Sequence, residues 1–405
     1  MKRYFPAKNL KINRWIKLVF FFILVGICCT RLELGVPVGT YKQFNRYPSL
    51  VYLPDYTTGP RIYASAAILV EAVSGMVLYA KNEHQQRAPA STTKVMTAIV
   101  SLEKGNLDEI VTISPRAARI GGSSLWLKPG EQITLRELLK GVLLCSGNDG
   151  SVALAEHIAG SEQEFVKLMN RKAKEIGALN SNFHNTHGLR APNHHSTAFD
   201  LALITRYALG NPEFSRIVAT KEEALEWYQG KKTRLVRNTN RLLWSFAGAD
   251  GVKTGTTSQA GYCLVASATR DGRKFISVVL NSPDRWGESA RLLEHGFNNF
   301  TLNLMAKADT PVAKVRIRQG KPAEVLLYPR RDLMVVIPKG KEGEVQRKVI
   351  LDHAALVPPV KAGSSVGKVS FYYKGTQVDW VDLFPMERIS RTYWWNKVFR
   401  RKQDE

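Results

Sequence analysis

Apolar runs broken by turn residues predict two β-hairpins in this chain. The first extends from Ser65 to Asn82 and turns at Val73-Ser74-Gly75. The second joins Tyr262–Ala268 to Phe275–Leu280 through an Asp-Gly turn. Short apolar segments separated by Gly-containing turns are typical of antiparallel strand pairs. We therefore expect strands near both ends of the region that these residues enclose.

Between the hairpins, the apolar positions follow the period of an α-helix. The spacing i, i+3, i+4, i+7, i+8 is clearest in Leu135, Leu138, Leu139, Val142 and Leu143. Such spacing places apolar side chains on one helical face. Residues 152–158 and 165–176 have a similar pattern, and residues 290–297, after the second hairpin, are predicted to form a closing helix. Strands at both ends with helices between them predict one mixed sheet whose first and last strands meet.

From Thr310 onward the pattern changes to short alternating segments separated by Gly and Pro. These segments are 313–317, 323–327, 333–337, 368–373 and 377–383. Alternation over such lengths is typical of strands. The predicted fold class is therefore α+β, with helices around a sheet in the first domain and a small, mostly β domain over residues 310–385.

The N-terminus carries an export pattern. Residues 1–17 contain six basic and no acidic side chains, and residues 18–30 are uncharged and strongly apolar. Thirteen helical residues span about 20 Å, short of the roughly 30 Å core of a bilayer. We therefore predict a signal peptide or N-terminal anchor over residues 1–31, followed by a Pro- and Gly-punctuated linker over 32–60.

Composition narrows the class of protein. The 405 residues are 44% hydrophobic and 23% charged, which excludes disordered, collagenous and multi-span membrane proteins. Four cysteines cannot form a disulfide scaffold. Two of them, Cys28 and Cys29, lie in the apolar N-terminal run. Cys145 and Cys263 lie in apolar surroundings, and we predict that both are free thiols.

The net charge of +23 favours anionic partners. Residues 386–405 combine basic side chains with Ile389, Trp395 and Phe399 on one helical stripe. This pattern is typical of an amphipathic helix on an anionic membrane surface; a helix docked on the β domain is the alternative. The sequence contains no nucleic-acid recognition motif, and the export signal also argues against such a partner.

Three short motifs carry candidate chemistry. In Ser91-Thr92-Thr93-Lys94, a helical turn would place Lys94 beside the Ser91 hydroxyl. Serine needs an adjacent base to act as a nucleophile, and a lysine held neutral by burial and nearby cations can be that base. By itself the pattern is also compatible with a helix N-cap at Ser91.

The other two motifs supply polar groups of the right kind. Ser146-Gly147-Asn148 follows a predicted helix. There Ser146 could relay a proton and Asn148 could bind a substrate amide, although alone this could be an ordinary loop. Lys253-Thr254-Gly255-Thr256 precedes the second hairpin. Lys253 and its neighbouring hydroxyl suit a substrate carboxylate, and Gly255 allows close approach of a ligand.

Together the motifs resemble those of penicillin-binding proteins and class A β-lactamases. Over residues 60–305 the chain resembles the D-alanyl-D-alanine carboxypeptidase family. The similarity rests on the following segments: 89–94 (PASTTK), 144–149 (LCSGND), 183–189 (FHNTHGL), 195–200 (HSTAFD) and 250–255 (DGVKTG). It implies a penicillin-recognising, transpeptidase-like catalytic domain over residues 61–305.

The resemblance also implies a mechanism. Ser91 would attack the carbonyl between two D-alanines of a peptidoglycan stem peptide, with Lys94 as base and Ser146 as proton relay. Asn148, Lys253, Thr254 and Gly255 would bind substrate, and backbone N–H groups of Ser91 and Thr256 would form the oxyanion hole. β-Lactam antibiotics would acylate Ser91. Neither a metal nor a cofactor is implied, and the place of action is the outer face of the cytoplasmic membrane.

Alternatives differ in substrate or chemistry. A DD-endopeptidase that cuts cross-links would use the same residues. A β-lactamase would need a glutamate for deacylation, and Glu175-Ile176-Gly177-Ala178-Leu179-Asn180 is one residue too long for the usual E-x-x-L-N. A zinc site built from His184, His187, His194 and His195 lacks an acidic or cysteine ligand at a familiar spacing. We therefore expect a serine peptidase.

Overall fold

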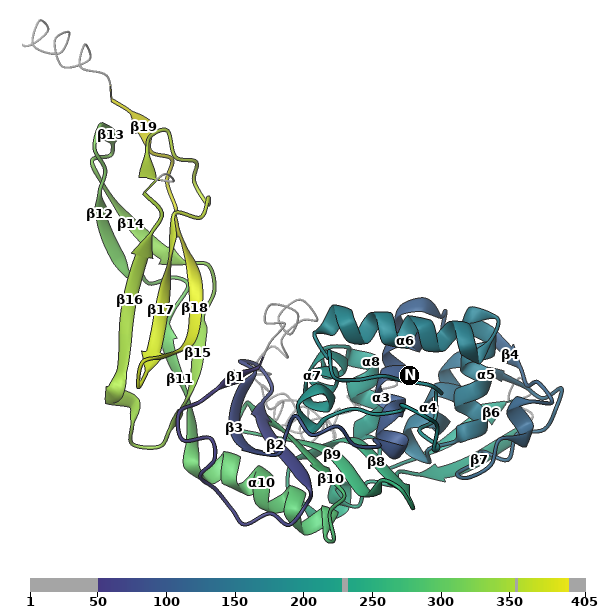
Figure 1. Cartoon of the computed structure of the whole chain (residues 1–405). Helices are drawn as coiled ribbons and strands as arrows, with labels where there is room; N and C mark the ends of the chain where they lie inside the picture. The colour runs from purple at the N-terminus through teal and green to yellow at the C-terminus, as the bar shows by residue number, and fades with distance from the viewer. Residues whose placement is uncertain (1–49, 228–231, 354–355, 393–405) are drawn as a thin grey trace, which may run out of the picture. The chain divides into compact units, whose positions relative to one another are not determined.

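A six-stranded sheet forms the centre of the first domain. The structure, a computed structural model, describes residues 50–227, 232–353 and 356–392 (Figure 1). The strand order is β1-β3-β2-β10-β9-β8. Strand β2 (Ala66–Glu71) pairs antiparallel with β3 (Met76–Lys81) on one side and with β10 (Arg273–Leu280) on the other. The first and last strands of the predicted sheet therefore meet, and the predicted hairpins are present.

The two edges of this sheet differ. Strand β9 (Gly261–Arg270) joins β10 to β8 (Ala249–Thr257), which forms one edge. The other edge is β1 (Val51–Tyr52), which runs parallel to β3. This short strand lies in the region expected to be a linker, because two residues are too few to show an alternating pattern.

Both faces of the sheet are covered, so β2 is buried along its whole length. Ile68 and Val70 pack into the helical core, whereas Leu69 packs with Phe275 and Leu293 in a second core. Successive side chains of a strand point to opposite faces. The sequence of β2 is therefore apolar at successive positions from Ala66 to Val70, as expected for a sheet covered on both sides.

Helices supply the two covering layers. The helix α10 (Arg285–Asn299) contacts β9 and β10 on one face, and α7 and α8 contact strands of the sheet from the other core. In addition to α10, the helical segments of this domain, with α7 and α8 among them, are η1 (Ala90–Thr93), α3 (Lys94–Lys104), η2 (Ala117–Arg119), α4 (Leu135–Leu144), α5 (Asn148–Ala159), α6 (Glu162–Ile176), α7 (Ala198–Leu209), α8 (Pro212–Ala219) and α9 (Leu242–Ser245).

Side-chain caps fix where several helices begin. Thr134, Ser161 and Thr197 accept hydrogen bonds from the backbone N–H three residues later, at the start of α4, α6 and α7. Such caps satisfy N–H groups that have no partner within the helix. Because α6 begins directly after Ser161, the position of its first residue, Glu162, is fixed. Helix α6 packs against α3 and α5.

A second, smaller sheet was not expected from the sequence. It contains β4 (Ile110–Thr112), β5 (Gln132–Thr134), β6 (Glu222–Trp227) and β7 (Lys232–Arg237) in that order. The first two strands have three residues each, too few for a readable period. The last two are rich in charged residues, so they lack the apolar pattern that predicts strands.

Residues 300–392 form the predicted β domain. Strand β11 (Phe300–Ala306) pairs with β15 (Leu333–Pro338), so the expected domain boundary at residue 305 falls inside a strand. A five-stranded sheet contains β12 (Ala313–Arg316), β14 (Glu324–Pro329), β18 (Thr376–Pro385), β17 (Gly367–Tyr373) and β16 (Val345–Leu351). The short pair β13 (Gly320–Lys321) and β19 (Ser390–Arg391) and the turn η3 (Glu342–Glu344) complete the domain.

The predicted membrane segments fall largely outside the described residues. The N-terminal segment 1–31 lies wholly outside them, and of residues 386–405 only 386–392 are described. In that part the expected helix is wrong, because Ile389 is buried in the β domain, where its backbone pairs with Val360, and Ser390–Arg391 form strand β19. The rest of the predicted helix stays a prediction. Among the helices that the structure describes, none combines the length and hydropathy needed to cross a bilayer.

Candidate active site

Ser91 and Lys94 come together at the junction of a 3₁₀ turn and a helix. Ser91 lies in η1, and Lys94 is the first residue of α3. Their side chains share one face, and Lys94 Nζ lies 3.1 Å from Ser91 Oγ. Ser91 is partly exposed, whereas Lys94 is fully buried. A reachable hydroxyl therefore stands beside an amine that solvent does not reach.

Two carbonyl oxygens complete the surroundings of Lys94. Its Nζ donates to Asn148 Oδ1 at 2.7 Å and to the His187 backbone carbonyl at 2.8 Å. A neutral lysine amine has two N–H bonds and one lone pair. In the structure, Nζ donates to Ser91 Oγ, and the Ser91 hydroxyl donates to the His187 carbonyl at 3.4 Å. In the neutral form, with both N–H bonds directed at the Asn148 and His187 carbonyls, the lone pair would face Ser91 Oγ. This is the arrangement that a general base for the Ser91 proton requires.

Burial determines the protonation of Lys94. It holds the pKa of Lys94 well below the usual value of 10.5, and the nearby Lys253 cation lowers this pKa further. Asp149 and Cys145 act in the opposite direction. Burial without a directly paired carboxylate disfavours the ammonium form. Lys94 can therefore accept a proton under conditions where an exposed lysine is already charged.

Ser146 lies in the short connection between α4 and α5, and Asn148 is the first residue of α5. Ser146 has a left-handed backbone conformation with φ of 68°, and its Oγ is buried without a hydrogen-bond partner among the described residues. Asn148 is held by its backbone N–H to Ser123 O and by its Nδ2 to Gly121 O, both at 2.7 Å. The amide is thus fixed, while the hydroxyl is left available.

The third motif lies on the edge strand β8. A Cβ added at Gly255 would lie 3.1 Å from Ser91 N and 3.0 Å from Pro89 O, so only glycine allows this strand so close to the nucleophile. Thr254 Oγ1 lies 2.7 Å from Thr239 Oγ1. The strand therefore runs directly past Ser91, as a peptide-binding edge should.

Lys253 on the same strand is 1% exposed, and its Nζ has no hydrogen-bond partner within the described part of the chain. Burial lowers its pKa to about 7; Arg285 also lowers it, whereas Cys145 raises it. A buried amine without a partner is rare in native proteins and indicates a ligand-binding role. An anionic ligand would raise the pKa of Lys253 and hold it protonated.

Comparison with known proteins gives the family. A family model described as D-alanyl-D-alanine carboxypeptidase matches residues 55–284, and one described as the C-terminal domain of penicillin-binding protein 5 matches residues 300–391. The chain belongs to the D-alanyl-D-alanine carboxypeptidase family. This confirms the predicted α+β fold class and the assignment as a serine-type carboxypeptidase, a hydrolase.

Individual relatives cover most of the chain. The D-alanyl-D-alanine carboxypeptidase DacF of Bacillus subtilis is 38% identical over 75% of this chain and 80% of its own length. DacC of Escherichia coli is 36% identical over 90% of this chain and 94% of its own length. The crystal structure of penicillin-binding protein 5 from Haemophilus influenzae has a TM-score of 0.72 and 35% identity, covering 82% of this chain and 99% of its own.

Three residues of this carboxypeptidase site were not found as such from the sequence. His187 contributes a backbone carbonyl, which has no residue-type signature. Asp149 accepts hydrogen bonds from the N–H groups of Leu125 and Leu127 and thereby fixes the loop that holds Asn148. Arg285 donates to Thr256 Oγ1 at 2.7 Å and to Gly255 O at 3.0 Å. Asp149 and His187 lie in segments that carry the family resemblance, 144–149 and 183–189, so these two had a signal that sequence reasoning could have used, whereas Arg285 had none.

The histidines have structural partners. His194 Nε2 lies 2.9 Å from Thr93 Oγ1, and its Nδ1 accepts a hydrogen bond from the backbone N–H of His184. Burial, with smaller contributions from neighbouring histidines, lowers the pKa of His194 to about 3, so the ring is neutral. In the part of the chain that the structure describes, no three His, Cys, Asp or Glu side chains gather where they could hold a metal ion.

Both cysteines of the catalytic domain are free thiols, as predicted. Burial raises the pKa of Cys145, and its Sγ donates to the Gly141 carbonyl at 3.2 Å. Burial also raises the pKa of Cys263. A thiol with a raised pKa is a poor nucleophile. Cys145 therefore lies next to the second motif as a packing residue.

Proposed function

We propose that this chain removes the terminal D-alanine from peptidoglycan stem pentapeptides through an acyl-enzyme on Ser91. The observation that carries the proposal is the set of polar groups around Ser91. Lys94 is directed at the nucleophile, while Ser146 Oγ and Lys253 Nζ are buried without partners among the described residues. These two groups are the ones that a leaving amine and a terminal carboxylate need.

Substrate binding uses the cationic side of the site. The terminal carboxylate of the stem peptide binds Lys253 and the Thr254 hydroxyl, and it draws Lys253 into the protonated form. Arg285 adds a second cation and orients the Thr256 hydroxyl. The Asn148 amide binds the peptide side. A ligand that ends in a carboxylate would give the buried Lys253 amine the partner that it lacks among the described residues.

The acylation step follows from the geometry around Lys94. The Oγ of Ser91 attacks the carbonyl between the two D-alanines while its proton passes to Lys94 Nζ. The oxygen of the tetrahedral intermediate is stabilised by the backbone N–H groups of Ser91 and Thr256. The proton then moves from Lys94 through Ser146 Oγ to the leaving amine, and the C–N bond breaks.

Hydrolysis completes the cycle. Water attacks the ester on Ser91, Lys94 takes the water proton, and Ser91 leaves with a proton as the shortened peptide departs. A β-lactam would acylate Ser91 in the same way, but its leaving group stays attached to the acyl group. The acyl-enzyme therefore persists and labels the protein covalently.

Product analysis tests the assignment. We expect the purified full-length chain to remove one alanine from pentapeptide muropeptides and to leave cross-linked dimers intact, as measured by mass spectrometry. Conversion of dimers to monomers would instead identify a DD-endopeptidase. If neither substrate changes while a β-lactam is consumed, the chain is a β-lactamase.

The structure favours the peptidase over the β-lactamase. Glu175, the carboxylate nearest to the β-lactamase pattern in sequence, lies on α6 with its side chain 52% exposed and paired with Lys172 at 2.7 Å. A deacylating glutamate must instead face the acyl group. In the proposed mechanism, Lys94 and not a glutamate takes the proton of the deacylating water. Without the dedicated glutamate of a β-lactamase, we expect β-lactams to be released slowly.

We further propose that the enzyme works outside the cytoplasmic membrane and is bound to its surface. The export pattern of residues 1–31 and the basic, aromatic pattern of residues 386–405 support this location. Basic side chains attract anionic headgroups, and the aromatic side chains enter the interface. The high net positive charge also suits anionic cell-wall polymers.

Deletion of residues 393–405, which keeps the buried Ile389 and strand β19 in the β domain, tests the surface anchor. In a chain that begins at residue 50, we expect this deletion to abolish co-sedimentation with anionic liposomes, because both the basic charge and the apolar stripe are lost. The matched protein that retains residues 393–405 should sediment with anionic vesicles and should be released by high salt. Equal sedimentation of the two proteins would contradict the anchor.

A further inference from the structure

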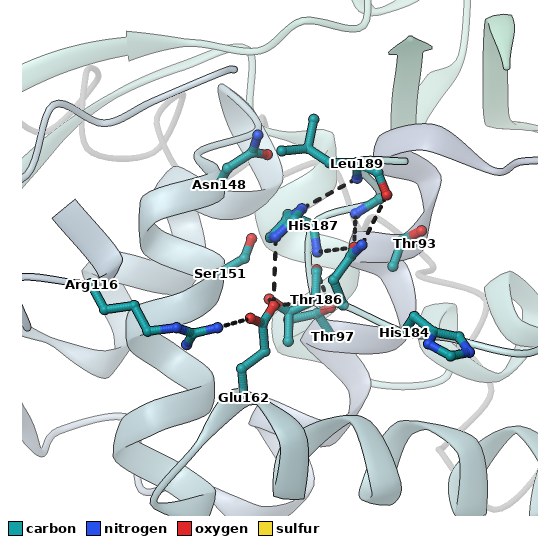
Figure 2. A network of polar contacts seen from close by, with 12 residues as sticks. Thr93, Thr97, Arg116, Asn148, Ser151, Glu162, His184, Thr186, His187 and Leu189 are labelled. Carbon is teal, nitrogen blue, oxygen red and sulfur yellow. Dashed lines mark hydrogen bonds and ion pairs between the residues drawn. The ribbon is translucent and has the colours of Figure 1, made fainter. Parts of the chain in front are cut away.

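A buried carboxylate lies behind the catalytic lysine, outside the three motifs. Glu162 is the first residue of α6 and is 6% exposed. Its Oε1 accepts hydrogen bonds from Thr186 N at 3.0 Å and from Thr186 Oγ1 at 2.9 Å. Figure 2 shows Glu162 facing the segment that contains Thr186 and His187. The carboxylate therefore fixes the backbone directly before the carbonyl that binds Lys94.

The same segment is held from the opposite side by the catalytic helix. Thr97, one turn after Lys94 on α3, donates from its Oγ1 to the Thr186 carbonyl at 2.6 Å. With its N–H held by Glu162 and its carbonyl held by Thr97, Thr186 cannot rotate. The next carbonyl, that of His187, consequently points at Lys94 Nζ.

The His187 ring is also oriented by Glu162. Its Nδ1 accepts a hydrogen bond from Leu189 N, so the ring proton is on Nε2, which lies 3.6 Å from Glu162 Oε1. Burial and the proximity of Lys94 lower the pKa of His187 to about 4, although Glu162 acts against this. The neutral ring therefore adds no positive charge beside the base.

Arg116 keeps Glu162 ionised and in place. The guanidinium bonds both Glu162 Oε2 and Glu156, and it is partly exposed. Burial raises the pKa of Glu162, but hydrogen bonds from Thr186 and Arg116 outweigh this and lower it below the usual value. A charged acceptor binds an N–H more strongly than a neutral one.

The segment Thr186–Gly188 is closely packed against the turn that contains Ser91. Gly188 has φ of 87°, and a Cβ there would lie 1.8 Å from the Ala90 carbonyl oxygen, next to Ser91. A shift of His187 would therefore move either the lysine contact or the nucleophile turn. The network connects Arg116 to Lys94 through the ion pair with Glu162, the hydrogen bonds of Glu162 to Thr186, the covalent backbone from Thr186 to His187, and the hydrogen bond between the His187 carbonyl and Lys94.

We propose that Glu162 is a positioning residue for acylation, which holds the Thr186–His187 backbone so that the His187 carbonyl directs the lone pair of Lys94 at Ser91. This inference rests on the proposed role of Lys94 as the base. Glu162 touches neither substrate nor nucleophile. Its effect is on the chemical step and not on the binding of substrate.

The kinetics of acylation by a fluorescent penicillin measure the chemical step and the binding of the ligand separately. In Glu162→Ala we expect the first-order acylation constant at saturating penicillin to fall by about 30- to 100-fold, because a small misplacement of a catalytic group costs this much. The dissociation constant of the noncovalent complex should stay within about twofold. Glu162→Gln keeps an acceptor oxygen for Thr186 and should lose only about three- to tenfold.

Glu71 provides a matched control. It is fully buried on β2 and, like Glu162, accepts hydrogen bonds from backbone N–H and hydroxyl groups, in this case the N–H groups of Val73 and Ser74 and the Ser74 hydroxyl. Glu71→Ala should lower the melting temperature, as Glu162→Ala should, yet leave the acylation constant unchanged. An equal loss of acylation in both variants would show that Glu162 acts only through stability and would overturn the proposal.

A second variant covers failure of Glu162→Ala to fold. Thr186→Val deletes only the hydroxyl that donates to Glu162 and should lower the acylation constant by about two- to tenfold, as expected for one hydrogen bond. Unchanged acylation in the Glu162 and Thr186 variants, with the wild type reactive, would refute the positioning role alone. An unreactive wild-type chain would refute the proposed function itself.

Discussion

Ser91→Ala is expected to lose both D-alanine release and covalent labelling by penicillin. Alanine keeps the turn at η1 but removes the only atom that can form the acyl bond in the proposed mechanism. The loss in turnover should be at least about 10⁴-fold, as for other catalytic serines. Release of D-alanine is followed by mass spectrometry, and labelling by fluorescence of the denatured protein on a gel.

Ser101→Ala is the matched control for this variant. Ser101 is buried on the same helix, α3, and its hydroxyl donates to the Thr97 carbonyl one turn earlier. Its loss should leave both readouts near the wild-type level. Retained labelling in Ser91→Ala would show that another residue is the nucleophile.

Lys94→Met has the second largest expected effect. Methionine fills a similar volume but offers no lone pair, so Ser91 would have no base. General-base catalysis contributes about 10² to 10⁴ in rate, and we expect acylation by penicillin to fall by about 10³-fold. Stopped-flow acylation kinetics measure this loss, because the step can be followed before deacylation begins.

The pH dependence of acylation follows from the lowered pKa of Lys94. The reactive form is the neutral amine, so the rate should increase as pH rises through this pKa. An unperturbed lysine would give this increase only near its usual pKa of 10.5. We therefore expect wild-type acylation to reach its plateau well below that pH and the acid limb to be absent from Lys94→Met.

Lys140→Met is the control for burial of a lysine. Lys140 is also buried on a helix, but its Nζ pairs with Glu137 and Glu223 at 2.6 Å each. Although burial opposes this, the hydrogen bonds to these carboxylates raise the pKa of Lys140 above its usual value. Its replacement should reduce stability and leave acylation unchanged. Wild-type acylation in Lys94→Met would assign the base to another group.

The sequence predicted the elements and motifs that depend on local patterns. The hairpins of β2–β3 and β9–β10 and the helix α4 have a regular period, and Ser91 and Lys94 are one helical turn apart. Convergence of Lys253 on the same site was expected only from the resemblance, because 162 positions separate it from Ser91 and no local rule joins β8 to η1.

The rest depended on tertiary structure. The His187 carbonyl is a backbone group, and any residue type carries one. Arg285 reaches the third motif from the start of α10, and Glu162 reaches Thr186 from the start of α6; neither has a motif of its own. Strands β6 and β7 are rich in charged residues and lack an apolar pattern of their own, so their sequences did not indicate that they pair in a sheet.

The pairing of β2 with both β3 and β10 has a consequence for how the chain reaches its place of action. The central strand of the sheet comes from residues 66–71, but one of its two neighbours comes from residues 273–280. Pairings between distant segments form slowly. A chain emerging from the ribosome therefore cannot complete this sheet until nearly the whole catalytic domain has been synthesised. For the export proposed above, this delay would keep the polypeptide unfolded during passage through a translocation pore, and the sheet would form afterwards.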